Sequence, residues 1–158
     1  MIEEDMEAFA AALPPVGALM GLDLGTKTIG VAVSDGMRSV ATPLETVKRV
    51  KFTADAARLK AIAEGRAITG IVLGLPRNMD GSEGPRSQST RAFARNLAGV
   101  LPLPIAFWDE RLSTVAAERA LLEADTSRAR RKEVIDHVAA SYILQGVLDR
   151  LAHLRQAQ

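Results

Sequence analysis

The most constraining feature of the chain is an apolar segment, residues 68–75 (ITGIVLGL), that carries no charged side chain. A segment of this kind predicts a strand buried on both faces, as in the centre of an α/β sheet. Residues 105–108 have the same character, and so do residues 18–25 apart from one carboxylate. We therefore expect three central, parallel strands with helices covering the sheet.

Two further strands are predicted at residues 29–34 and 40–47, each reached by a short turn. With residues 18–25 they form an antiparallel meander, and Pro43 places the third strand of this meander at an edge. The expected fold class is thus α/β, with a central mixed five-stranded sheet flanked by helices.

After the meander the apolar period changes to that of a helix. Phe52, Ala56, Leu59 and Ala63 are spaced four, three and four residues apart, which predicts an amphipathic helix that ends at Gly65. Three later segments predict helices: one from Pro85, one capped by Ser113 or Thr114 and running through Leu122, and one from Lys132 to about Leu151. Residues 124–131 are expected to form a polar loop.

The composition fits a single compact domain. The chain has 158 residues, of which 47% are hydrophobic, and its net charge is +1. Residues 1–17 form an acidic extension, residues 18–152 the expected domain, and residues 153–158 a tail. No apolar run has the length of a membrane span, residues 1–17 do not resemble a signal peptide, and cysteine is absent. These features favour a cytoplasmic protein without a membrane partner.

Three carboxylates stand at positions where apolar residues would be expected. Asp23 interrupts the apolar strand at residues 18–25 and shares a face with Gly21 and Gly25, which leaves room for an ion or a phosphate. The competing interpretation is an Asp paired with a neighbouring lysine or turn amide. Glu110 follows the strand at residues 105–108, where a local salt bridge with Arg111 is the alternative.

Asp136 shares one face of the last helix with small and apolar residues, so it is expected to point towards the sheet. The alternative is an Asp that is favoured near a helix N-terminus by the helix dipole. If the fold brings Asp23, Glu110 and Asp136 together, they form an all-oxygen cluster suited to a hard cation such as Mg²⁺. Such clusters are typical of enzymes that cut or transfer phosphodiesters.

A dense basic run precedes Asp136 in the sequence and consists of Arg128, Arg130, Arg131 and Lys132. A run of this kind could bind the phosphates of a nucleic acid. It could equally be a solvated loop without a ligand.

Four segments, taken in order, resemble the YqgF family: GLDLGTKTIGVAVSD (21–35), GLPRNMDGSEGPRSQSTRAFA (74–94), DERLSTVAAE (109–118) and IDHVAASYILQ (135–145). The resemblance covers about residues 18–152 and implies an RNase H-like fold. It also implies a nuclease, described for the family both as a Holliday junction resolvase and as an enzyme that processes the precursor of 16S ribosomal RNA.

The resemblance places the family's acidic site on Asp23, Glu110 and Asp136. It implies hydrolysis with Mg²⁺, or with Mn²⁺ as an alternative, held by these three residues. Nucleic acid would be bound by Lys27, Arg77, Asn78, Arg111, Arg128, Arg130, Arg131 and Lys132. Arg77 and His137 depart from the family's usual residues near the expected site, which bears on the choice of substrate and not on the chemistry.

The favoured function is processing of the 5′ end of the 16S rRNA precursor during ribosome biogenesis, with ribosomal particles as potential partners. Resolution of Holliday junctions in DNA is the alternative. The sequence does not choose between these substrates or between a monomer and a homodimer. Two rivals of other classes remain: an ATPase of the sugar-kinase, actin and Hsp70 type, suggested by Asp-Leu-Gly-Thr-Lys, and a non-catalytic RNA-binding or antitermination factor.

Overall fold

The computed structural model describes residues 1–112 and 128–157, and it describes side chains except for those of residues 128–136. The predicted helix from Ser113 or Thr114 through Leu122 lies outside the described residues. The elements follow in the order β1 (Ile2–Glu3), α1 (Met6–Ala12), β2 (Ala18–Leu24), β3 (Thr28–Ser34), β4 (Ala41–Lys48), α2 (Phe52–Gly65), β5 (Ile68–Leu75), α3 (Pro85–Ala98), β6 (Ile105–Asp109), the short 3-10 helix η1 (Glu110–Leu112) and α5 (Arg128–Gln156).

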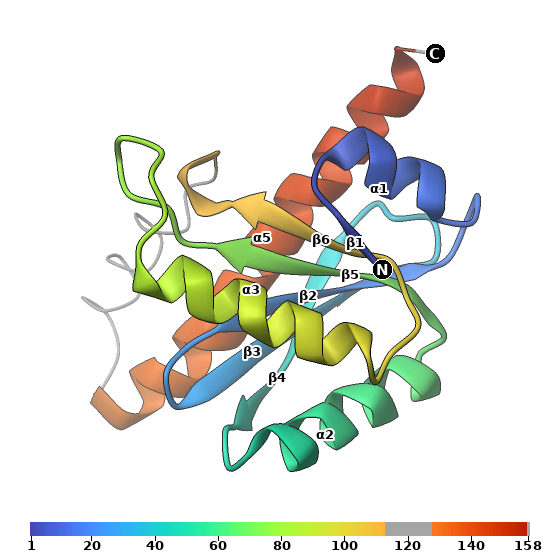
Figure 1. Cartoon of the computed structure of the whole chain (residues 1–158). Coiled ribbons are helices and arrows are strands. Elements are labelled where there is room, and N and C mark those ends of the chain that lie inside the picture. The colour runs from blue at the N-terminus through green and yellow to red at the C-terminus, as the bar shows by residue number, and fades with distance from the viewer. Residues whose placement is uncertain (113–127, 158) are drawn as a thin grey trace.

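The strands form one mixed sheet in the order β1-β6-β5-β2-β3-β4. β2, β3 and β4 form the predicted antiparallel meander, while β2, β5 and β6 are parallel. The α/β class, the meander and the five predicted strands are therefore confirmed. The carboxyl ends of β2, β5 and β6 lie together at one end of the sheet, where α2 and α3 also begin (Figure 1).

Within the described residues the sheet has six strands and not the expected five, because the N-terminal segment adds β1 at the edge. β1 has two residues and pairs in parallel with β6, where Ile105 N donates to Met1 O at 2.8 Å. So short a strand has no apolar period in the sequence, since the pairing depends on main-chain hydrogen bonds. The edge strand was missed for this reason.

Residues 1–17 also provide a folded helix. Asp5 caps α1 by accepting a hydrogen bond from Ala8 N at 2.7 Å, and Phe9 is fully buried. Phe9 packs beside Gly70 of β5, where a Cβ would lie 3.2 Å from the ring. The acidic extension is thus packed against the sheet, with its charged residues towards solvent.

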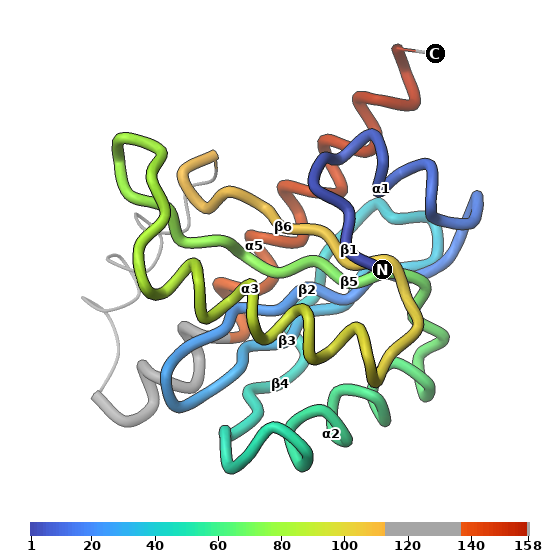
Figure 2. Tube along the Cα trace, viewed as in Figure 1, coloured from blue at the N-terminus to red at the C-terminus, as the bar shows by residue number. Residues whose placement is uncertain are grey.

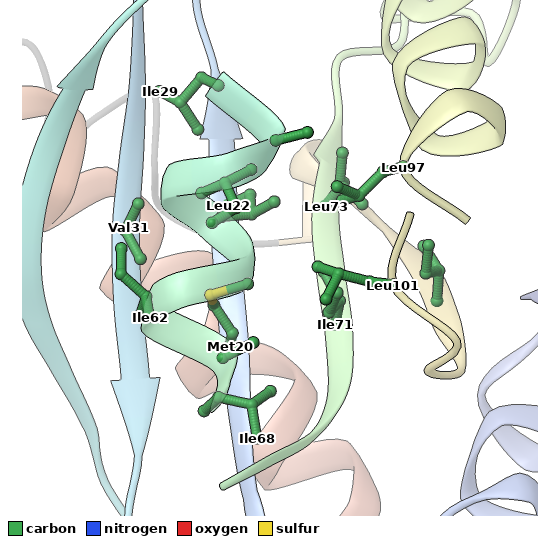
Figure 3. Close-up of a cluster of buried hydrophobic side chains, with 14 of the residues drawn as sticks. Met20, Leu22, Ile29, Val31, Ile62, Ile68, Ile71, Leu73, Leu97 and Leu101 are labelled. Carbon is green, nitrogen blue, oxygen red and sulfur yellow. The ribbon is translucent and has the colours of Figure 1, made fainter. Parts of the chain in front are cut away.

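Two helical layers enclose the sheet. α2 and α3 cover one face, and the long α5 crosses the other, as the ribbon and the tube show (Figure 1, Figure 2). On the first face Met20, Leu22 and Leu73 pack against α2 and α3 (Figure 3). On the second face, Ala140, Ile143 and the other apolar residues of α5 pack against the sheet, as the sequence predicts.

The last helix is longer than predicted at both ends. α5 begins at Arg128 and ends at Gln156, so the basic run lies in its first turns and not in a loop. Arg, Ala and Lys are strong helix formers, so a run that is rich in them can continue a helix even though it is densely charged. The expected tail at residues 153–158 is likewise largely helical. Within the described residues, no helix combines the length and the apolarity needed to cross a membrane.

Candidate active site

Asp23 occupies a buried position near the carboxyl end of β2. Its neighbours Leu22 and Leu24 point into the core under α2 and α3, so the strand alternation turns Asp23 towards the α5 face. Only 3% of Asp23 is exposed. The predicted face of β2 is thus confirmed for Gly21 and Asp23, which lie opposite the larger core, whereas Gly25, predicted on the same face, lies beyond the end of the strand.

Two glycines make space on this face of the sheet. A Cβ at Gly21 would lie 2.8 Å from the Cβ of Leu144, so α5 rests directly on the β2 backbone there. In β5, Leu73 pairs with Leu22, which puts the next residues, Gly74 and Asp23, side by side on the α5 face. Close approach of this kind requires residues without side chains.

Glu110 reaches this glycine from β6. It opens η1 directly after the strand, and a Cβ at Gly74 would lie only 2.7 Å from Glu110 Oε1. The carboxylate therefore lies over the β5 backbone, beside the strand that carries Asp23. The structure brings these two predicted residues to the same end and the same face of the sheet.

Asp136 belongs to the first turns of α5, and its side chain lies outside the described residues. Its neighbour His137 places the backbone: His137 Nδ1 is 3.0 Å from Thr46 Oγ1. Thr46 pairs with Gly30, and Gly30 pairs with Asp23. The backbone at residue 136 therefore lies over the cross-strand row of the sheet that contains Thr46, Gly30 and Asp23.

The oxygen ligands present are suited to a hard divalent cation. Asp23 and Glu110 offer carboxylate oxygens at the same end and face of the sheet, and such oxygens are the ligands that an ion of this kind prefers. Among the described side chains, no group of three metal-ligating residues is complete. Asp136, predicted as the third ligand, is not among those side chains.

The predicted nucleic-acid contacts lie around the same end of the sheet, but ion pairs occupy two of them. Arg111 Nη2 is 2.6 Å from Asp109 Oδ2, and this guanidinium holds the pKa of Asp109 below its usual value. Arg77 Nη2 is 3.6 Å from Glu83. Arg111 also donates to Met79 O at 3.5 Å, so it ties the end of β6 to the loop after β5.

Asn78 has a structural role within that loop. Its amide donates to Ser82 Oγ at 3.0 Å, and its backbone N donates to Ser82 O at 2.9 Å. Lys27 is exposed in the turn between β2 and β3. The side chains of Arg128, Arg130, Arg131 and Lys132 lie outside the described residues.

Sequence reasoning missed three basic residues near the same strand ends. Arg49, Lys51 and Arg86 are exposed and lie on the face of the sheet opposite Asp23, where α2 and α3 begin. The signal for two of them is the segment Lys48-Arg49-Val50-Lys51, a basic group between a strand and a helix.

A mixed sheet with a leading antiparallel meander, and with carboxylates at its parallel strand ends, defines the RNase H-like class. A solved structure of Thermus thermophilus RuvC in complex with a Holliday junction substrate is similar in fold, with a TM-score of 0.54 and 13% identity. That similarity covers 86% of this chain and 96% of the other.

Sequence comparison identifies the family. The model of the RuvX family, described as Holliday junction resolvase, matches residues 17–150, and the chain belongs to this family. A Cereibacter sphaeroides protein named "Putative pre-16S rRNA nuclease" is 79% identical over 151 residues, which are 96% of this chain and 94% of that protein. A Paracoccus denitrificans protein of the same name is 72% identical over the full length of both chains. The resemblance stated from the sequence motifs is confirmed.

Proposed function

We propose that this protein is a metal-dependent nuclease that processes the 5′ end of the 16S rRNA precursor. The observation that carries the proposal is the placement of Asp23, near the carboxyl end of β2, and Glu110, directly after β6, on either side of Gly74 in β5. The names of relatives that are 72% and 79% identical over nearly the whole chain support the choice of ribosomal RNA precursor. An enzyme of this kind would act in the cytoplasm.

In the proposed site, Asp23, Glu110 and Asp136 would hold Mg²⁺ or Mn²⁺. Divalent cations in such sites activate a water and stabilise the charge on the leaving oxygen. Gly21 and Gly74 let α5 pack directly on the strands, and Gly74 also admits the carboxylate of Glu110. The pair of Arg111 and Asp109 fixes the start of η1, from which Glu110 projects.

The second candidate is resolution of Holliday junctions. It is favoured by the description of the family and by the fold shared with RuvC. A non-catalytic RNA-binding role is the third candidate, and the intact set of Asp23, Glu110 and Asp136 argues against it.

The test is a cleavage assay of the purified protein on two substrates in parallel, a 16S rRNA precursor fragment and a four-way DNA junction. Each is incubated with Mg²⁺, with Mn²⁺ and with a chelator, and Asp23→Asn serves as the inactive control. We expect metal-dependent cutting of the RNA at its 5′ side. Cutting of the junction alone would replace the proposal with the second candidate, and binding of RNA without any cutting would support the third.

A further inference from the structure

A basic cleft lies on the side of the sheet opposite the carboxylates. It has a volume of about 490 Å³ and is bounded by the turn after β2 and by the beginnings of α2 and α3. These three segments lie together at one end of the molecule (Figure 1). Neither the family description nor the names of the relatives assigns a role to this cleft.

The charge of the cleft is positive. Arg49, Lys51 and Arg86 line it, together with the hydroxyl-bearing residues Thr26 and Ser89. Asp55 is the single carboxylate in the lining; only 3% of it is exposed, and it accepts a hydrogen bond from Val50 N at 3.1 Å. Within the described part of the chain, no carboxylate forms an ion pair with Lys51 or Arg86.

Arg49 connects the cleft to the strand that carries Asp23. Its Nη1 donates to Gly25 O at 2.6 Å, and its guanidinium lies 5.7 Å from the centre of the Phe93 ring. The side chain is therefore held in place between the β2–β3 turn and α3. A cation with a fixed position is better suited to binding an anion than a freely moving one, because less side-chain entropy is lost.

The N-termini of α2 and α3 border the cleft, and neither is capped by the side chain of its N-cap residue. Lys51 and Gly84 are the N-cap residues of α2 and α3, and neither makes a capping side-chain hydrogen bond. The positive end of α3 therefore adds to the field of the three basic side chains, while Asp55 in the first turn of α2 offsets part of the positive end of that helix. The electrostatics favour an anion with several acceptor oxygens.

We propose that this cleft binds a backbone phosphate of the same nucleic-acid strand that is cut at Asp23. Leu24 and Gly25, which directly follow Asp23, are part of the cleft lining. A strand can thus pass over the end of β2 from the carboxylates on one face to the cations on the other. The inference rests on the proposed function for the identity of the strand, and contacts of this kind hold a strand without reading its sequence.

The test compares two double variants with equal loss of charge. Lys51→Ala/Arg86→Ala removes two cations from the cleft, whereas Lys60→Ala/Arg95→Ala removes two exposed cations further along the same helices. Binding of a short RNA from the 16S precursor is measured by fluorescence anisotropy at several salt concentrations. All proteins carry Asp23→Asn in addition, so that binding is measured without cutting, and melting curves verify that each variant is folded.

The cleft variant should bind about tenfold more weakly than the control variant. Its slope of log affinity against log salt should be flatter by about one unit, as for one lost phosphate contact. A further series of RNAs carries a neutral methylphosphonate in place of a single backbone phosphate. The parent protein should bind more weakly when this replacement is at one particular position near the cleavage site. The cleft variant should be insensitive to that same replacement.

Equal affinities and slopes in the two double variants would overturn the proposal. The proposal would also be overturned if inorganic phosphate shifted the amide signals of Lys51 and Arg86 in NMR spectra with a Kd as low as that of the RNA. The site would then be one for small anions. The proposed function fails separately. If the protein with Asp23 intact cuts neither substrate but the cleft variant still loses RNA affinity, the cleft assignment stands and the nuclease assignment does not.

Discussion

The two faces of the sheet differ in chemistry at the same strand end. On the α5 face, Asp23 and Glu110 lie on either side of Gly74, and their carboxylates are suited to a cation. On the α2 and α3 face, Arg49, Lys51 and Arg86 line a cleft that is suited to an anion. One strand serves both faces, since Asp23 points to the first while Leu24 and Gly25 border the second.

This difference suggests that the carboxylates of the α5 face cut the nucleic-acid strand and that the cations of the opposite face help to bind it. Removing a carboxylate from the α5 face should stop the chemistry and leave affinity largely intact. Removing a cation from the opposite face should weaken binding and leave the chemistry of the bound strand largely intact. Each prediction below tests this division, beginning with the largest expected effect.

Loss of a carboxylate should have the largest effect. Asp23→Asn, Glu110→Gln and Asp136→Asn should each lower the cleavage rate by more than about a hundredfold, because changes to groups that merely support metal ligands already cost 10–100-fold. Single-turnover assays at saturating RNA measure this, with melting curves as the control for folding. A folded Asp136→Asn protein that cuts at the normal rate would return Asp136 to a helix-dipole role.

The basic run at the start of α5 tests whether binding is confined to one face. Changing Arg128, Arg130 and Arg131 to alanine should weaken binding to all nucleic acids alike. The slope against salt should fall by about 2 to 3 units if three phosphates are contacted. Lys60, Arg66 and Arg95 changed together to alanine provide the matched control. An unchanged slope would identify the run as a solvated helix end.

Gly74 tests how closely Glu110 must approach the sheet. A Cβ in Gly74→Ala would lie 2.7 Å from Glu110 Oε1 and 2.5 Å from Ile143 Cδ1. We expect a loss of stability of about 1–3 kcal/mol from overpacking, and a roughly tenfold to hundredfold slower reaction from the displaced carboxylate.

Gly21→Ala is the comparison for this variant. It crowds Leu144 on the same face without touching Glu110, so it should lose similar stability but much less activity. Equal losses of activity in the two variants, measured at a temperature where both are folded, would show that the position of Glu110 over Gly74 is unimportant.

Binding of a cation should give the smallest effect. Carboxylates held close together repel one another, so Mg²⁺ or Mn²⁺ should stabilise the folded state by mass action. At a metal concentration near 100 times Kd, the melting temperature should rise by about 5–10 °C. Asp23→Asn should show a much smaller rise in the same calorimetric scan. Equal rises in both proteins would exclude a metal site at Asp23.

Much of the fold could be predicted from local patterns in the sequence. The apolar segments of β2, β5 and β6, the period of α2 and the face of α5 each depend on residues near one another in the chain. The alternation of β2 alone determines that Asp23 and Leu22 point to opposite faces. These features are local, so they could be read without knowing the sheet order. Their positions in the sequence already grouped Asp23, Glu110 and Asp136 as a possible set, and the resemblance to family motifs then pointed to the same three residues.

Features that depend on distant segments of the chain could be known only from the folded structure. The pairing of β1 with β6 joins residues about one hundred positions apart, and a two-residue strand has no signal of its own. The same holds for the position of Glu110 over Gly74, and for the cleft that brings Arg49 and Lys51 next to Arg86. The ion pairs of Arg77 and Arg111 likewise depend on the loop after β5 and the end of β6. Charge in a sequence shows which side chains can bind an anion, but their partners depend on the folded chain.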